Sequence, residues 1–279
     1  DPSQVKQLNN FSGSNPTTLR DYQMLADACN RAGRARLEGQ AYYKIGTMHE
    51  ELGKPKMAIK NYKKFLRICI KNKDSVGEAL ALNCIAVTHQ QQADEENIRY
   101  GIDYHMKHSE QADPQGKVVA HINLGLSYAK LGDTDSSIEH QKSALFYALQ
   151  IDDKQAESIS LANLGLLGKA QGDFKTTQAC MEEYLEKSTI LHDYVGQSEA
   201  YLHLAALAKE KSEHKAASKL LKKAMNIARD RGDQQQENQL KCNIGVVKGD
   251  FLFEDYLKKL GYKMKKKLLN QYVDDAPVQ

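Results

Sequence analysis

Several residue types and sequence patterns that identify common classes of protein are rare or absent in this chain. It has no Trp, an aromatic fraction of 7%, and five Pro, none of them between residues 115 and 276. Long stretches without proline permit long uninterrupted helices. No run of about 18 apolar residues is present, which excludes an apolar membrane-spanning segment. No signal-peptide pattern opens the sequence.

Cysteine is also scarce, and the charge is nearly balanced. The five cysteines are widely scattered and show no C-x-x-C spacing: Cys29, Cys69, Cys84, Cys180 and Cys242. This pattern argues against a disulfide framework and favours a reducing, cytoplasmic compartment. A net charge of +3 does not by itself imply a nucleic-acid partner, and 41% apolar residues are too many for a disordered chain.

What the chain does have is a repeat. A small residue preceded by an apolar one recurs at intervals of 39 or 40 residues: Gly46, Ala86, Gly125, Gly165, Ala205 and Gly245. A fixed period of this size is typical of stacked repeats, in which each unit is too thin to bury its own apolar face.

Each complete repeat reads as a helix, a tight turn and a second helix. In the stretch 118–153, apolar residues follow a helical period, stop at Gly132-Asp133, and resume with the same period. The same shape recurs in two later stretches, with turns at Gly172-Asp173-Phe174 and Ser212-Glu213-His214. The small residue would let the two helices of a pair approach closely. The sequence therefore predicts an all-α, right-handed solenoid of tandem helix-turn-helix repeats.

These segments resemble tetratricopeptide repeats. The family pattern of small, aromatic and glycine positions is matched by Gly125, Tyr128, Gly132, Ser137 and Ala144. The resemblance covers roughly residues 17 to 255. Its period is 40 rather than the family's usual value of about 34, which is similar to the long-repeat subclass of polarity, spindle-orientation and cytoskeletal adaptors. The family's closing Pro is absent, and turns such as Asp152-Asp153 and Arg231-Gly232-Asp233 replace it.

The predicted boundaries follow from this register. They are a poorly patterned segment 1–16, a solenoid 17–255, a Lys-rich cap helix 256–270 and a flexible tail 271–279. Within the solenoid we expect a half repeat at 17–33 and repeats at 38–75, 78–114, 117–153, 156–193, 197–233 and 236–255. The second repeat has a longer acidic turn, Ala93 to Arg99, and the last is truncated, with Gly249-Asp250-Phe251 arriving early.

The beginning of the chain is less regular. Asn15-Pro16 is typical of a helix start, and the helix from Leu19 to Arg31 carries Tyr22 and Leu25 forty residues before Tyr62 and Phe65. This segment matches the second helix of a repeat. Either the chain is cut from a longer protein, or the missing first helix lies within residues 1–12.

The first helices of stacked repeats line the inner, concave surface, and their inward positions define the candidate binding site. One such position holds Lys44, Cys84, Asn123, Asn163, His203 and Asn243. The neighbouring position adds Asn83. Because an Asn amide both donates and accepts, a ladder of amides can hold the backbone of an extended peptide. The long-repeat adaptors that the chain resembles use inner-face Asn in this way. Alternatively, the amides bond neighbouring backbone within the solenoid.

The remaining inward positions are apolar, with lysines at the edge. Leu126 and Leu166 lie on the expected floor of the groove, and Lys169 and Lys209 on its rim. This combination favours a peptide or helix with apolar and some acidic residues. Part of the apolar strip could equally pack between repeats.

No catalytic, metal or cofactor signature is present. His105 and His108 are three residues apart, and His49 and His89 occupy the family's aromatic position, but no third or fourth ligand has suitable spacing. Phosphate loops, nucleophile elbows and H-E-x-x-H are absent. The sequence therefore predicts a chain that is not an enzyme and that binds no cofactor.

The C-terminal segment is rich in lysine: Lys258, Lys259, Lys263, Lys265, Lys266 and Lys267. These lysines could contact an acidic protein, RNA or an anionic membrane, or could simply solvate a cap helix.

Three functions follow from these features. The first is a protein-interaction scaffold that binds a peptide or helix in its groove. The second is a structural part of a cytoskeletal or ciliary assembly, held by the convex and terminal surfaces. The third is RNA binding by the basic end.

Overall fold

The computed structural model describes residues 17–92 and 94–274, with side chains as far as residue 265. The chain divides into two compact units, Asp1–Ser160 and Leu161–Gln279. Within the described residues every regular element is an α-helix, which confirms the all-α prediction. None of these helices is long and apolar enough to cross a membrane.

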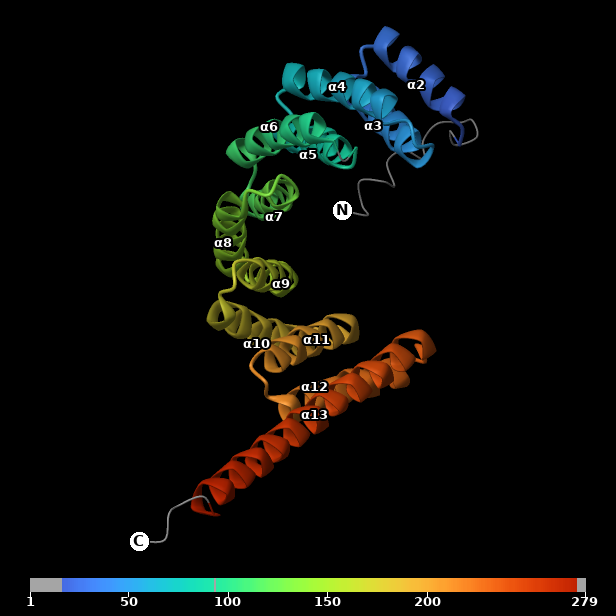
Figure 1. The fold of residues 1–279 in the computed structure, drawn as a ribbon. Coiled ribbons are helices and arrows are strands. Elements are labelled where there is room, and N and C mark those ends of the chain that lie inside the picture. Colours follow the sequence, from blue (N-terminus) through green and yellow to red (C-terminus); the bar gives the residue numbers. More distant parts are fainter. Residues whose placement is uncertain (1–16, 93, 275–279) are drawn as a thin grey trace. The chain divides into compact units, whose positions relative to one another are not determined.

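The first unit is a series of antiparallel helices of similar length. They are α2 (Leu19–Arg31), α3 (Ala35–Glu51), α4 (Pro55–Asn72), α5 (Ser75–Gln90), α6 (Glu95–Gln111), α7 (Pro114–Lys130) and α8 (Thr134–Gln150). Each helix packs on the next along the chain, and α5 also contacts α7. Helices α5 and α7 thus lie side by side. In Figure 1, α6 and α8 lie to the left of these two helices.

Helix α9 (Lys154–Ala170) crosses the boundary between the units. The second unit continues with α10 (Phe174–Ile190), α11 (Tyr194–Glu210), α12 (His214–Asp230) and α13 (Gln234–Asp274). Neighbours along the chain again pack together, α10 on α11, α11 on α12 and α12 on α13. Ala217, Leu221 and Ala224 of α12 share a buried cluster with Leu240 and Ile244 of α13.

The recurring small residue has the mechanical role expected of it. A Cβ at Gly46 would overlap the ring of Tyr62, and a Cβ at Gly125 would overlap Gln141. Both partners belong to the second helix of the same pair, and both are buried. The glycine therefore provides the space in which a large side chain of the facing helix packs.

Most turns between the described helices share one backbone feature. A residue with positive φ ends one helix, and the next residue, usually Asp, caps the following helix. At Gly132-Asp133, φ of the glycine is 79° and the Asp133 carboxylate accepts from the backbone N–H of Ser136 at 3.0 Å. Among the described residues, four other than glycine adopt the left-handed conformation: Lys73, Asp152, His192 and Ser212. Turns lie at 132–133, 152–153, 172–173, 212–213 and 231–233, as predicted, except that Phe174 and His214 are already the first residues of α10 and α12.

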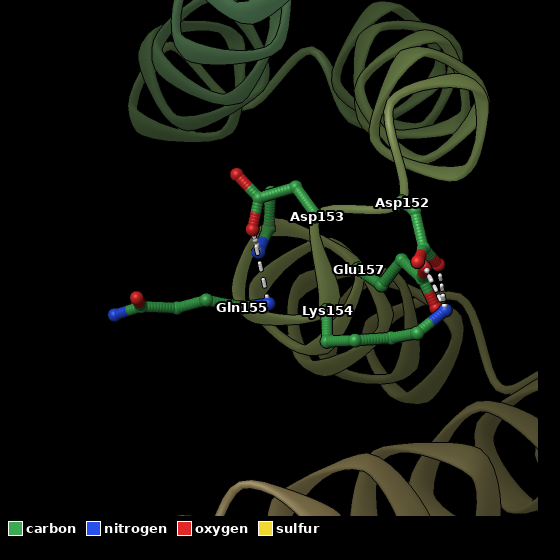
Figure 2. Close-up of polar contacts among 6 residues, drawn as sticks. Asp152, Asp153, Lys154, Gln155 and Glu157 are labelled. Carbon is green, nitrogen blue, oxygen red and sulfur yellow. Dashed lines mark hydrogen bonds and ion pairs between the residues drawn. The ribbon is translucent and has the colours of Figure 1, made fainter.

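The α8–α9 turn shows how a residue other than glycine is accommodated (Figure 2). Asp152 has a φ of 56°, and its carboxylate lies 2.5 Å from Lys154 Nζ. Lys154 Nζ also lies 3.0 Å from the Glu157 carboxylate, whose side chain is 1% exposed. Asp153 accepts from the backbone N–H groups of Gln155 and Ala156 at 3.1 and 3.0 Å. The caps and ion pairs offset part of the cost of the left-handed residue.

This geometry predicts opposite effects for two substitutions in the first unit. Lys73→Gly should raise the free energy of unfolding by about 1 kcal/mol, because glycine adopts positive φ without steric cost. Gly132→Ala should lower it by about 1–2 kcal/mol. A Cβ at Gly132 would meet nothing within 4 Å, so the loss reports backbone strain alone. Urea titrations measure the free energy of unfolding of both variants. A change of the same sign in the two variants would contradict the role given to positive φ at residues 73 and 132.

Three predicted boundaries differ from the structure. Helix α2 begins at Leu19 with Thr18 as its N-cap, so Pro16 is not its first residue. Helix α6 begins at Glu95, capped by Asp94, so the longer turn expected at 93–99 is wrong because Glu95 and Glu96 join the first helical turn. Helix α13 runs without a break through Gly249-Asp250-Phe251, so the last repeat and the cap helix expected at 256–270 are one helix. The predicted segment 1–16 and most of the predicted tail 271–279 lie outside the described residues.

Candidate functional site

Two amide side chains from neighbouring repeats meet on the face shared by α5 and α7. Asn123 Nδ2 donates to Asn83 Oδ1 at 3.3 Å, and both side chains are half-buried. The helices that carry them are capped by aspartates, since Asp74 accepts from Gly77 N at 2.9 Å and Asp113 from Gly116 N at 2.8 Å. The pair is thus held at fixed points of two rigid helices.

Further polar contacts fix the register of α5 against α7. Gln90 Nε2 donates to the Asn123 carbonyl oxygen at 3.4 Å, and Lys130 Nζ donates to the Gln90 carbonyl oxygen at 3.3 Å. These two bonds correspond to the alternative role, in which inward polar groups bond neighbouring backbone. The Asn83–Asn123 contact is different, because it joins two side chains.

The amide pair retains unused hydrogen-bonding groups. The shared bond uses one proton of Asn123 and the carbonyl oxygen of Asn83. No other hydrogen bond of either side chain occurs among the described residues. The NH₂ of Asn83 and the carbonyl oxygen of Asn123 therefore offer a donor next to an acceptor. A single peptide group, with one C=O and one N–H, presents the complementary set.

Apolar side chains surround the pair. On α5, Val76 and Leu80 lie seven and three residues before Asn83, and they are 79% and 41% exposed. On α7, Val119 and Leu126 flank Asn123 at spacings of four and three residues, and both are 39% exposed. These spacings place all of them on one face of their helix. We call these six residues, Val76, Leu80, Asn83, Val119, Asn123 and Leu126, the amide patch.

The sequence predicts half of the amide patch. Asn83, Asn123 and Leu126 are expected on the inner surface, whereas Val76, Leu80 and Val119 were missed. The signal that would have found them is the i, i+4, i+7 spacing that each shares with its Asn.

The remaining candidates of the first unit make no hydrogen bond with the pair among the described residues. Lys44 is exposed on α3, and its Nζ lies 5.9 Å from the centre of the Tyr43 ring. Cys84, which the count from Ala86 placed in line with Asn123, is not its partner, because Asn123 bonds Asn83 instead. Burial, and then the nearby Glu50, raise the pKa of Cys84 to about 12, so its thiol stays protonated.

The second unit carries the other inward candidates. Asn163 and His203 are half-buried, Leu166 is 43% exposed, and Asn243 is exposed. Burial lowers the pKa of His203, and the nearby Lys169 lowers it further, so the imidazole is neutral at pH 7. No hydrogen bond joins Asn163, His203 and Asn243 to one another in the described part of this unit.

Two of these candidates have defined surroundings. Lys209 Nζ lies 3.0 Å from the Asp250 carboxylate of α13, so this rim lysine is already paired. Asn243 lines a shallow depression of about 680 Å³ on α13, together with Gln234, Gln235, Asn238, Gln239 and Cys242. Of the two lysines predicted on the rim, only Lys169 lacks an ion pair within the described part of this unit.

The C-terminal lysines are exposed on α13 as far as the side chains are described. Lys258, Lys259, Lys263 and Lys265 are all exposed, and Lys259 pairs with Asp255 at 2.6 Å. The side chains of Lys266 and Lys267 lie outside the described residues.

The histidines singled out in the sequence are packed side chains. His49, His105 and His108 are buried, and burial lowers the pKa of each, that of His105 to about 3. His89 Nδ1 lies 2.7 Å from Asn97 Oδ1. Within the described residues no three His, Cys, Asp or Glu side chains are grouped as metal ligands.

A ring stack between α7 and α8 was missed. His121 and His140 approach with their Nδ1 atoms 3.1 Å apart, and Tyr147 and Tyr128 stack on their outer faces. Burial lowers the pKa of both imidazoles, that of His121 to about 4, so one neutral ring donates to the other. The stack joins the two helices of this pair.

A profile of the tetratricopeptide repeat family matches residues 39–69 and 118–145. The first segment runs from α3 into α4 and the second from α7 into α8, with Gly46 and Gly125 in their first helices. These two segments therefore match tetratricopeptide repeats.

Solved structures with the same fold support this assignment. Aspartyl phosphate phosphatase F from Bacillus subtilis is 16% identical, with a TM-score of 0.66 over 97% of this chain and 72% of that one. The TPR-like repeats of a Podosopora anserina putative kinesin light chain are 11% identical, with a TM-score of 0.58 over 72% and 98% of the two chains. A Rap protein complexed with competence and sporulation factor is also 11% identical, with a TM-score of 0.52 over 89% and 78%.

At these identities the tetratricopeptide-repeat likeness concerns the fold alone. No curated protein sequence matches the chain.

Proposed function

We propose that this chain is a non-catalytic scaffold that binds an extended peptide segment of a partner protein at the amide patch. The observation that carries the proposal is the Asn83–Asn123 bond, which leaves a donor and an acceptor side by side on an otherwise apolar surface. A peptide backbone satisfies both, while its side chains cover Val76, Leu80, Val119 and Leu126.

The chemistry of the patch favours binding over catalysis. Amides and alkyl groups neither ionise near neutral pH nor act as nucleophiles, so the patch offers recognition without a reacting group. The structural likeness to a Rap protein complexed with competence and sporulation factor is consistent with a scaffold that binds another molecule.

The bound segment is extended rather than helical at the point of contact. The free amide groups can bond only a backbone whose C=O and N–H are not already used in a helix. Specificity would come from apolar side chains on either side of the bonded peptide group, and affinity from the backbone bonds.

The test is a peptide selection followed by affinity measurements. Peptides are selected from a random library on the intact chain, and the binding of the strongest is compared for the chain and for an Asn83→Ala/Asn123→Ala variant. Loss of two hydrogen bonds should weaken binding by about tenfold or more. Both side chains are only half-buried, so the variant should keep the helical content of the parent.

A matched control removes two asparagines elsewhere. Asn72 and Asn226 are exposed on α4 and α12, and Asn72→Ala/Asn226→Ala should bind as the parent does. Equal affinity of the amide-patch variant and this control would contradict the proposal. Replacing the peptide backbone N–H groups one at a time with N-methyl groups adds a second readout, because one position should then account for most of the loss.

The alternative function, a part of a cytoskeletal or ciliary assembly, rests on repeat length. Asn83 and Asn123 bond at a separation of 40 residues, which is compatible with the long-repeat subclass of adaptors. Contacts within such an assembly would use the convex and terminal surfaces. The C-terminal part of α13, whose described side chains from residue 256 to 265 are all exposed, is one such surface.

A further inference from the structure

Helix α13 is packed on one side only. Leu240, Ile244 and Val247 are buried in the cluster shared with α12. Beyond this cluster, α13 contacts the preceding helices through Asp250, which pairs with Lys209, and through Phe251, whose ring centre lies 6.2 Å from that of His214. The last contact is that of Glu254, whose carboxylate lies 3.0 Å from His214 Nε2. The helix then continues to Asp274, past the N-terminal end of α12 at His214 (Figure 1).

The opposite side of α13 has an open notch where the other repeats are filled. At Gly46, Gly125 and Gly165, an added Cβ would meet a side chain of the following helix, namely Tyr62, Gln141 and Met181. At Gly245, which has the same place in the repeat, nothing lies within 4 Å, and the same holds at Gly249. The space that a second helix occupies elsewhere is therefore empty at this end of the described chain.

An apolar stripe extends from this notch along α13. Gly245, Gly249, Phe253, Tyr256 and Leu260 recur at spacings of three and four residues and so share one face of the helix. Phe253 is 61% exposed, Tyr256 59% and Leu260 40%. This face points away from the one formed by Leu240, Ile244 and Val247. We call these five residues the open face of α13.

The apolar side chains of this stripe are exposed because the C-terminal part of α13 has no helix packed against it among the described residues. Every described side chain from residue 256 to 265 is exposed, so this stretch of helix has no tertiary support. A helix segment of this length is marginal in water without a packed face. A row of exposed aromatic and aliphatic side chains marks an interaction surface.

The charges around the stripe specify its partner. Between residues 245 and 265 there are three carboxylates, and each lies next to a cation or an imidazole of this chain: Asp250 by Lys209, Glu254 by His214, and Asp255 by Lys259. Four lysines of the same stretch take no part in these contacts: Lys248, Lys258, Lys263 and Lys265. At 100° per residue, Lys248 and Lys263 lie toward one edge of the open face, whereas Lys258 and Lys265 lie on the opposite side of the helix. A second copy of α13 would bring lysine against lysine, which disfavours self-association.

We propose that the open face of α13 binds an amphipathic helix of a partner protein, which packs a large apolar side chain over Gly245 and places Asp or Glu residues against Lys248 and Lys263. The bound helix completes the last repeat, as α12 completes the pair begun by α11. This site is separate from the amide patch, and the two can succeed or fail independently.

The test uses defined peptides and the full chain. The probe is a 20-residue labelled peptide with Leu at helical a and d spacing and Glu at the flanking positions. Two matched peptides carry Lys in place of Glu, or the acidic composition in scrambled order. Fluorescence anisotropy should show binding of the acidic amphipathic peptide at least about tenfold tighter than of either matched peptide.

Variants then locate the site. Phe253→Ala/Leu260→Ala removes two exposed side chains and should weaken binding of the acidic peptide by about tenfold or more. Phe146→Ala/Leu149→Ala removes two side chains of similar exposure from α8, 63% and 57%, and should leave binding unchanged. Gly245→Leu should weaken peptide binding while raising the thermal stability of the second unit, because the new side chain fills the notch and favours the helix.

Four outcomes would overturn the proposal. The scrambled peptide could bind as tightly as the amphipathic one, or the Lys-flanked peptide as tightly as the acidic one. A 20-nucleotide oligo(U) could bind more tightly than the peptide and be unaffected by Phe253→Ala/Leu260→Ala, which would make the end an RNA site. Sedimentation could show a dimer of the chain that this variant dissociates, which would make a second copy the occupant.

Discussion

Replacing Tyr62 with Ala is expected to lower the free energy of unfolding of the first unit by about 3–5 kcal/mol. The Tyr62 side chain is fully buried, fills the notch at Gly46, and packs beside Ala58 and Ile85. Its hydroxyl donates to Glu50 Oε2 at 2.7 Å. The substitution therefore leaves a cavity between two helices of a repeat and also removes a buried hydrogen bond. Amide hydrogen exchange of α3, α4 and α5 in the intact chain measures the loss locally.

Tyr62→Phe is the matched control. It keeps the ring and removes only the hydroxyl, while Glu50 still accepts from Thr88. The expected loss is about 1 kcal/mol. If Tyr62→Ala were no more destabilising than Tyr62→Phe, the notch at Gly46 would not be a packing site, and the small residue of each repeat would need another explanation.

Acid should destabilise the first unit well before its carboxylates titrate, and His105 should be a main cause. His105 is fully buried, and neither ring nitrogen has a hydrogen-bond partner among the described residues. Burial, and then His108, lower its pKa to about 3, against about 6.5 in the unfolded chain. The unfolded state therefore takes up the proton first, and stability that is complete above pH 6.5 is lost as the pH falls toward 3. At pH 4 the loss from His105 alone is about 3 kcal/mol.

His105→Phe separates this effect from those of the other histidines. The variant places at residue 105 the side chain found forty residues earlier at Phe65, so the core should accept it. Urea unfolding at pH 7, 5.5 and 4 should show that its stability falls by about 3 kcal/mol less than that of the parent chain. If the curves of unfolding free energy against pH were parallel for the parent and the variant, the His105 ring would have a hydrogen-bond partner or contact with water in solution.

The fold could be predicted from the sequence because its signals are local. Most turns depend on one residue that accepts positive φ, usually followed by an aspartate that caps the next helix, as at Gly132-Asp133. Both can be recognised within a few residues, and the pattern recurs forty positions further on. The α6 boundary was misplaced because Glu95 and Glu96 resemble a loop by composition, although acidic residues also favour the first turn of a helix.

The site was harder to predict because it depends on register between repeats. The small residues Ala86 and Gly125 are 39 apart, whereas the amides that bond, Asn83 and Asn123, are 40 apart. Counting from the small residue therefore pointed to Cys84. Which side chains of neighbouring helices meet is decided by packing in three dimensions, and a difference of one residue changes the partner.

The continuation of α13 as one helix past Gly249-Asp250 could not be predicted from the sequence for a related reason. Gly249-Asp250 resembles the turns at 132–133 and 172–173, but those turns are followed by a second helix that packs on the first, as the contacts of Gly125 with Gln141 and of Gly165 with Met181 show. After Asp250 the pattern changes to Phe253, Tyr256 and Leu260, which continue the helical period. Without a packed partner to favour the turn, the chain remains helical through the glycine.

Whether the Asn83–Asn123 pair holds a peptide backbone can be observed in the side-chain amide signals of asparagine. In the intact chain labelled with ¹⁵N at asparagine, a selected peptide is added and the NH₂ resonances are followed by NMR. We expect the Asn83 and Asn123 signals to shift with the same dissociation constant as the affinity measurement, while those of Asn72 and Asn226 stay in place. If saturating peptide left the Asn83 and Asn123 signals unmoved, the amide patch would not be the binding surface, and the peptide would occupy another part of the chain.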